Sequence, residues 1–173
     1  MSDWDVIVVG AGNAALAAAV SAREQGAARV LALEKAPRAL RGGNTHYSGG
    51  LLRIAFDRAE DLRALVPDAE GEVPGFYAGV EPYPHRRFMD DLLRVTDGRT
   101  DPELAELLIG RSYETACWMA RQGIEMEPAV SLSAVRVGDT IKWSPGAVIR
   151  AKHEGVGLSA MWFRAAERQA TAE

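Results

Sequence analysis

The sequence predicts an α/β fold built around a parallel βαβ unit, and three consecutive segments near its start carry that prediction. Residues 5–9, DVIVV, form a β-branched run typical of a strand buried on both faces of a parallel sheet. Residues 13–25 are rich in alanine and favour a helix, which Gly26 would end. Residues 29–33, RVLAL, form a second apolar strand. Short connections between the three predict a right-handed crossover.

The turn between the first strand and the helix carries a dinucleotide-binding pattern. Gly10, Gly12 and Ala15 match G-x-G-x-x-A, in which the glycines allow a tight turn and a close approach to a pyrophosphate. Asn13 and Ala14 begin the helix, where free amide groups and the helix dipole attract phosphate. The unit is therefore expected to be Rossmann-like and to bind a dinucleotide.

An acidic residue ends the second strand, as this pattern requires. Glu34, followed by Lys35, is placed to accept hydrogen bonds from the hydroxyls of an adenosine ribose. A carboxylate there would repel a ribose 2′-phosphate, so the sequence disfavours NADP.

The glycine-rich segment that follows favours FAD over NAD. Residues 37–50 read as a loop, in which Gly42, Gly43, Asn44 and Thr45 could offer donors to a phosphate or a ribityl chain. Ser48, Gly49 and Gly50 could pass close beneath a flat ring, because glycine leaves room for one. The alternative is a flexible surface loop without a ligand.

The middle of the chain is expected to be mainly helical. Residues 67–84 contain many prolines and glycines and should have little regular structure, whereas residues 85–98 predict a helix. Asp101 and Pro102 predict the N-cap and first residue of another helix, which ends at Gly123. Short β-like pieces, SAVRV and TIKW, follow within residues 124–145, and residues 154–170 predict a last helix. The face of the 102–123 helix expected in the core consists of Leu104, Leu107, Leu108, Thr115, Trp118 and Met119.

Composition excludes several classes of function. The net charge is −4 with acidic and basic residues interspersed, which argues against nucleic acid. No apolar run approaches the roughly 20 residues of a membrane span, and the acidic start MSDWD is unlike a signal peptide, so we expect a cytoplasmic protein. A single cysteine, Cys117, excludes an internal disulfide, and the three histidines share no metal-ligand spacing.

Beyond these patterns, the segments VIVVGAGNAALAAAVSAREQGA, LEKAPRALRGGNTHYSGG, DLLRVTDGRTDPELAELLI and GVGLSAMWFRAAERQ resemble a known family. It is the FAD-dependent fumarate reductase and succinate dehydrogenase flavoprotein superfamily, with the closest resemblance to the tricarballylate dehydrogenase branch. The resemblance implies hydride transfer between FAD and a small polycarboxylate, a capping domain and an electron-acceptor partner protein. It assigns Gly10, Gly12 and Ala15 to the pyrophosphate turn, Glu34 to the ribose, and the 42–50 segment to the flavin. His46 lies too close to Gly49 for the histidine that bonds FAD covalently in some members, so non-covalent FAD is expected.

Members of this family are considerably longer, which implies an N-terminal fragment with an incomplete Rossmann-like unit and the start of a helical capping region. The expected division is residues 1–55 and 153–173 in the FAD domain, with an excursion over residues 56–152. No catalytic residue is assigned, the chain alone is expected to be inactive, and His85, Arg86, Arg87 and Arg99 are expected on solvated faces. The alternatives are a non-catalytic FAD- or nucleotide-binding fragment, an NAD-dependent oxidoreductase, and a decayed gene product without a ligand.

Overall fold

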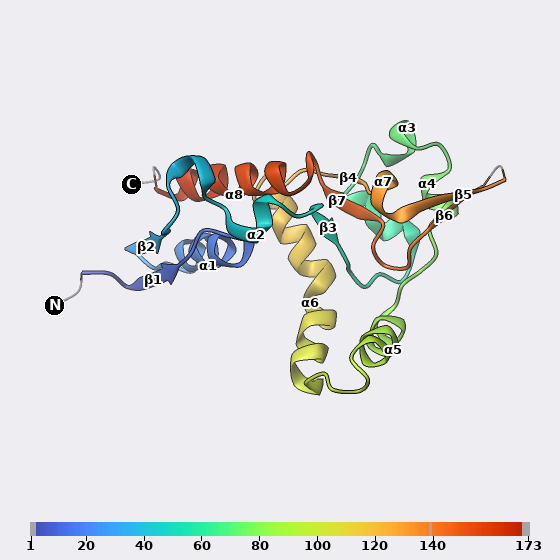
Figure 1. Cartoon of the computed structure of the whole chain (residues 1–173), viewed down its shortest axis with the longest axis horizontal. Helices are drawn as coiled ribbons and strands as arrows, with labels where there is room; N and C mark the ends of the chain where they lie inside the picture. Colours follow the sequence, from blue (N-terminus) through green and yellow to red (C-terminus); the bar gives the residue numbers. More distant parts are fainter. Residues whose placement is uncertain (1–2, 139, 171–173) are drawn as a thin grey trace. The chain divides into compact units, whose positions relative to one another are not determined.

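A computed structural model of the chain describes residues 3–138 and 140–170. The described chain divides into two compact units. The terminal unit comprises residues 3–50, 122–124 and 151–170, and the central unit comprises residues 51–121 and 125–150. Figure 1 shows the elements of both along the chain.

The terminal unit begins with the predicted βαβ unit. Strand β1 (Val6–Val9), helix α1 (Asn13–Glu24) and strand β2 (Val30–Leu33) follow one another, and the two strands pair in parallel from Val6 opposite Val30 to Val9 opposite Leu33. The α/β prediction is therefore confirmed, with element ends within one residue of those expected.

The burial predicted for the first strand is wrong. Ile7 is 50% exposed and Val9 is 82% exposed, so β1 is not covered on both faces. The reason is that β1 and β2 form a two-stranded sheet among the described residues, and α1 packs against these strands without covering the side chains of Ile7 and Val9.

The 37–50 segment, predicted as a loop, contains two short helices. They are the 3₁₀ helix η1 (Arg38–Leu40) and helix α2 (Gly43–His46). Gly42 precedes α2 with a φ of 111°, a conformation that glycine adopts readily and that turns the chain into the helix. Helix α8 (Glu154–Ala170), predicted from the sequence, packs against both α1 and α2 (Figure 1).

The central unit is mainly helical, with two small sheets. Strands β3 (Leu51–Leu52), β7 (Ile149–Ala151) and β4 (Met126–Pro128) form one sheet in the order β3-β7-β4, in which β3 and β7 are antiparallel. The predicted β-like pieces form the antiparallel hairpin of β5 (Ala134–Val137) and β6 (Thr140–Trp143). Two short helices lie in the 67–84 stretch, where little regular structure was expected, because Phe76 and Tyr77 are buried there. The helices of the central unit are η2 (Ala59–Ala64), α3 (Ala69–Glu72), α4 (Phe76–Gly79), α5 (His85–Val95), α6 (Pro102–Arg121) and α7 (Val130–Ser133).

Helix α6 starts as predicted but buries only part of the expected face. The Asp101 carboxylate accepts hydrogen bonds from the amides of Glu103 and Leu104, which confirms the N-cap. Of the expected residues, Met119 is buried and Trp118 is half-buried, whereas Thr115 is exposed and Leu104, Leu107 and Leu108 are 58–64% exposed. The other buried residues of the helix are Ala105, Ile109 and Ala116. Two apolar stripes at helical spacing share Met119, and the core of the central unit packs against the one that holds Ile109 and Ala116.

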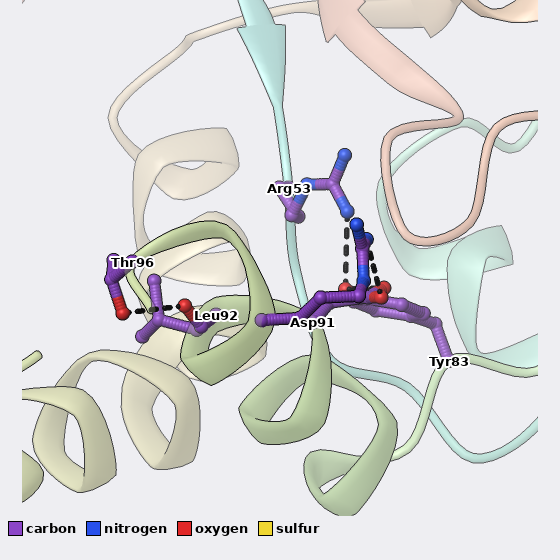
Figure 2. A network of polar contacts seen from close by, with 6 residues as sticks. Arg53, Tyr83, Asp91, Leu92 and Thr96 are labelled. Carbon is purple, nitrogen blue, oxygen red and sulfur yellow. Dashed lines mark hydrogen bonds and ion pairs between the residues drawn. The ribbon is translucent and has the colours of Figure 1, made fainter. Parts of the chain in front are cut away.

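A buried tyrosine links two parts of the central unit (Figure 2). The Tyr83 hydroxyl accepts a hydrogen bond of 3.0 Å from Arg53 and donates one of 2.9 Å to the Asp91 carboxylate on α5. Burial raises the pKa of Tyr83 above its usual value. Hydrogen bonds from Arg94 and then Tyr83 hold the pKa of the Asp91 carboxyl below its usual range.

Replacing Asp91 should therefore destabilise the chain, relative to the unchanged protein, more near neutral pH than in acid. Since its folded-state pKa is lowered, the ionised carboxylate stabilises the fold above the unfolded pKa of about 3.9, and this stabilisation is lost as the pH falls through the folded pKa. We expect Asp91→Asn to lower the free energy of unfolding by about 1 kcal/mol at pH 7 and by less at pH 3, measured by urea unfolding of the full chain.

The matched control is Asp90→Asn, because the Asp90 side chain is 70% exposed and its ion pair with Arg86 is 4.0 Å long. An exposed pair of this kind contributes little, so the control should change the free energy of unfolding by under about 0.5 kcal/mol at either pH. An equal loss for Asp91→Asn at both pH values would contradict the role given to its charge.

Candidate functional site

All the predicted cofactor-binding residues lie in the terminal unit, and the turn after β1 is their centre. Gly10 has a φ of 108°, a conformation that favours glycine, and its amide donates to the carbonyl of Leu33 at 2.6 Å. This hydrogen bond joins the turn to the end of β2. The glycine turn after β1 and Glu34 after β2 therefore lie at the same edge of the sheet.

The first turn of α1 is open to an anion. Gly12 is its N-cap and makes no side-chain capping bond, so the amides of Ala14 and Ala15 keep the donor capacity of a helix N-terminus. A Cβ added at Gly12 would lie 3.4 Å from the Thr45 hydroxyl oxygen, which is tight contact. Because Gly12 has no side chain, the backbone at the start of α1 can lie close to the 42–50 segment.

The glycine-rich segment lies directly against this helix end. The Asn13 amide donates a 2.8 Å hydrogen bond to the Thr45 hydroxyl oxygen. The Thr45 hydroxyl still has its own hydrogen to donate, because a hydroxyl is both acceptor and donor. Amides of the first turn and the Thr45 hydroxyl thus form one set of donors.

The rest of the segment is ordered by its own contacts. The Ser48 hydroxyl donates to the Thr45 carbonyl at 2.9 Å and accepts from the Gly50 amide at 3.2 Å. Gly42 and Gly50 are buried, whereas Gly43, Asn44 and Ser48 are exposed and Gly49 is half-buried. These bonds disfavour the alternative of a flexible loop.

Glu34 follows β2 directly and lies beside a cavity. One of its carboxylate oxygens accepts from the Ala36 amide at 2.8 Å, and the other has no hydrogen-bond partner among the described residues. The cavity of about 630 Å³ is lined by β2, α1 and α8, and also by Glu34, Arg38 and Arg41. Lys35 beside it is exposed.

Helix α8 holds the site together, and sequence reasoning missed this role. The Trp162 indole nitrogen donates a 2.5 Å hydrogen bond to the Asn13 side-chain oxygen. A Cβ at Gly155 would overlap the Thr45 carbonyl oxygen, and one at Gly42 would overlap the Ser159 hydroxyl. Arg41 stacks on the Phe163 ring with 3.6 Å between its guanidinium carbon and the ring centroid. The glycines at 155 and 157, unfavourable in a helix, were the signal that a close approach occurs there.

Other polar residues singled out in the sequence have partners on the surface of the central unit. His85, Arg87 and Arg99 lie 3.0–3.4 Å from the carboxylates of Glu106, Glu81 and Asp97, respectively. His46, in the terminal unit, packs edge-to-face on Tyr47. In the part of the chain that the structure describes, no three His, Cys, Asp or Glu residues are grouped to hold a metal ion. No described helix combines the length and the apolar character that crossing a membrane requires.

The donor set fits the pyrophosphate of a dinucleotide. Phosphate is bound in such sites by backbone amides in the first turn of a helix, a hydroxyl beside them and a glycine that leaves space for a close approach, and the start of α1 brings together these groups at Ala14, Ala15, Thr45 and Gly12. A carboxylate at the end of the neighbouring strand completes the pattern.

Comparison with known proteins agrees with this geometry. Residues 5–171 match the model of the FAD binding domain family, which indicates FAD as the cofactor. The chain is 25% identical over 146 residues to an NADH:fumarate oxidoreductase of Klebsiella pneumoniae, covering 84% of this chain and 14% of that protein. It is 24% identical over 147 residues to a fumarate reductase (cytochrome) of Shewanella frigidimarina, covering 85% and 22%. A digoxin reductase of Eggerthella lenta is 31% identical over 144 residues, covering 80% and 23%.

The chain therefore spans less than a quarter of the length of these relatives. The family match nevertheless extends over almost all of it, through both the fingerprint turn and helix α8. The chain belongs to the FAD-binding domain family of FAD-dependent flavoprotein oxidoreductases.

Proposed function

We propose that the terminal unit binds FAD non-covalently, with the pyrophosphate at the N-terminus of α1. The observation that carries this proposal is the hydrogen bond from the Asn13 amide to Thr45, which sets a second donor segment against the open helix end. The amides of Ala14 and Ala15 and the Thr45 hydroxyl would donate to the phosphate oxygens. Gly10 and Gly12 would let the backbone come close to them.

The adenosine end of FAD would lie toward Glu34. Its free carboxylate oxygen would accept from the ribose hydroxyls, and the cavity beside it offers space for a nucleoside. The negative charge at this position is unfavourable for a 2′-phosphate, which supports FAD or NAD over NADP. Lys35, exposed beside Glu34, would lie at the solvent side of this end of the cofactor.

The flavin end would follow the 42–50 segment. Gly43, Asn44 and Ser48 are exposed there and can approach a ribityl chain, and the half-buried Gly49 would leave room beneath the ring. The space beside the buried Gly50 is instead filled by the backbone of Glu154, so this glycine serves the packing of α8. The side chain of His46 packs against Tyr47 within the segment, which supports non-covalent binding.

We further infer that the longer protein of this type oxidises or reduces a small polycarboxylate, as in tricarballylate dehydrogenases and fumarate reductases. Bound FAD supplies the hydride-accepting and hydride-donating chemistry for such a reaction. The resemblance of the sequence to the tricarballylate dehydrogenase branch supports this substrate class, as do two relatives whose names specify fumarate. A separate electron-acceptor protein would then exchange electrons with the flavin.

A side chain at position 12 should abolish the close approach that FAD needs. We expect Gly12→Val to weaken FAD binding at least tenfold, because its methyl groups would occupy the space between the α1 N-terminus, Thr45 and the phosphates. The measurement is flavin absorbance retained by the purified full chain after free FAD is removed, followed by fluorescence titration.

The matched control is Gly110→Val in α6, where an added Cβ meets no atom within 4 Å apart from the neighbouring backbone of the helix itself. This variant should keep the affinity of the unchanged chain. Wild-type chain that is folded yet retains no FAD would overturn the proposal, as would a folded Gly12→Val chain with unaltered affinity.

This chain should bind FAD without oxidising or reducing a substrate. No described residue is assigned a catalytic role, and Arg87 and Arg99 are paired with carboxylates, so we expect the FAD-loaded 173-residue chain to bind flavin without turnover. Anaerobic addition of tricarballylate or succinate should leave the flavin absorbance unchanged. A longer protein containing this segment should show substrate-dependent bleaching with one of them, and bleaching of the short chain would contradict this expectation.

A further inference from the structure

Trp162 occupies an unusual place for a core tryptophan. It is fully buried in α8, yet its indole nitrogen makes a 2.5 Å hydrogen bond to the side-chain oxygen of Asn13. Asn13 is the first residue of α1 and so belongs to the turn that binds phosphate in this fold. A residue 149 positions away in sequence thus contacts the first turn of the cofactor helix.

Asn13 is held from two sides. Its side chain is bound by Trp162, and its backbone amide donates to Thr45 at 2.8 Å. The two bonds hold the same residue, so the bond from Trp162 restrains the position of Asn13 at the start of α1, and with it the amide that orients the Thr45 hydroxyl. The three segments α1, α2 and α8 therefore meet at Asn13.

The surrounding packing leaves α8 little freedom to move. A Cβ at Gly155 would overlap the Thr45 carbonyl, and a Cβ at Gly42 would overlap Ser159 of α8. α8 and the 42–50 segment are thus in close backbone contact, and the same helix carries the indole that binds Asn13. Fixing donors before the ligand arrives lowers the entropy lost on binding.

We propose that Trp162 is a positioning residue for the FAD pyrophosphate, acting through Asn13 and Thr45; this inference rests on the proposed function. Trp162 itself does not donate to the phosphate. It orients Asn13, whose amide occupies one lone pair of the Thr45 hydroxyl oxygen and leaves the hydroxyl hydrogen for the ligand. The phosphate is then bound by Ala14, Ala15 and Thr45 rather than by the Asn13 amide.

The test is a double-mutant cycle on FAD affinity. Trp162→Phe keeps an aromatic side chain in the core and removes the indole donor, and Asn13→Ala removes the acceptor. Each is expected to raise the Kd for FAD about 5- to 20-fold, as loss of one orienting hydrogen bond would. Because Trp162 acts through Asn13, the double variant should bind no more weakly than the weaker single variant, within about twofold.

Trp143→Phe is the matched control, since it removes an indole from the central unit. The Trp143 indole nitrogen is buried and has no hydrogen-bond partner among the described groups. This variant should leave the Kd unchanged, while thermal unfolding of every variant reports stability separately. A tryptophan that only fills the core would lower the unfolding temperature without the shared, non-additive loss of affinity.

The outcomes distinguish the two proposals. Wild-type chain that fails to bind FAD overturns the proposed function and this inference with it. Wild-type binding with an unchanged Kd for folded Trp162→Phe, or fully additive losses in the cycle, overturns the inference alone. Should Trp162→Phe not fold, Asn13→Ala decides: an unchanged Kd overturns the role of this bond, and a 5- to 20-fold rise supports it.

Discussion

The hydrogen bonds at Asn13 are the constraint on which the candidate site depends. A helix N-terminus attracts anions by itself, but its amides define only part of a pyrophosphate site. Here the amide of Asn13 binds Thr45 and its side chain binds Trp162, so three segments distant in sequence meet at one residue. The donors of α1 and the Thr45 hydroxyl are thereby set in place without a ligand, and the cost of ordering them is met on folding.

Small residues make this meeting possible. Gly12, Gly42 and Gly155 lie where the three segments approach most closely, and side chains at the last two would overlap neighbouring atoms. The absence of side chains at these glycines thus permits the close packing of α8 and also leaves space at Gly12 for the cofactor. The glycines contribute less by flexibility than by the absence of a side chain at a contact between backbones.

Local pattern predicted the βαβ unit, its turn and the N-cap of α6, because those features depend on neighbouring residues. Gly10, Gly12 and Glu34 could be identified because each has a defined role at a fixed position in the dinucleotide-binding pattern. Trp162 and Ser159 were not, because their contacts with residues 13 and 42 depend on how α8 docks. The same limit explains Leu104, Leu107 and Leu108 of α6, where two stripes fit helical spacing and tertiary packing chose between them. Ile7 and Val9 were assigned to a covered strand on composition, which carries no information about neighbouring strands.

The most direct measurement is the amide NMR spectrum of the ¹⁵N-labelled full chain during titration with FAD. We expect the amide resonances of Ala14 and Ala15 to shift progressively with occupancy, with the proton moving downfield as it donates to phosphate, and ADP to reproduce these shifts. Gly110 in α6 should not move. Saturable binding of FAD that leaves the Ala14 and Ala15 amides unshifted would contradict the claim that this helix end holds the pyrophosphate.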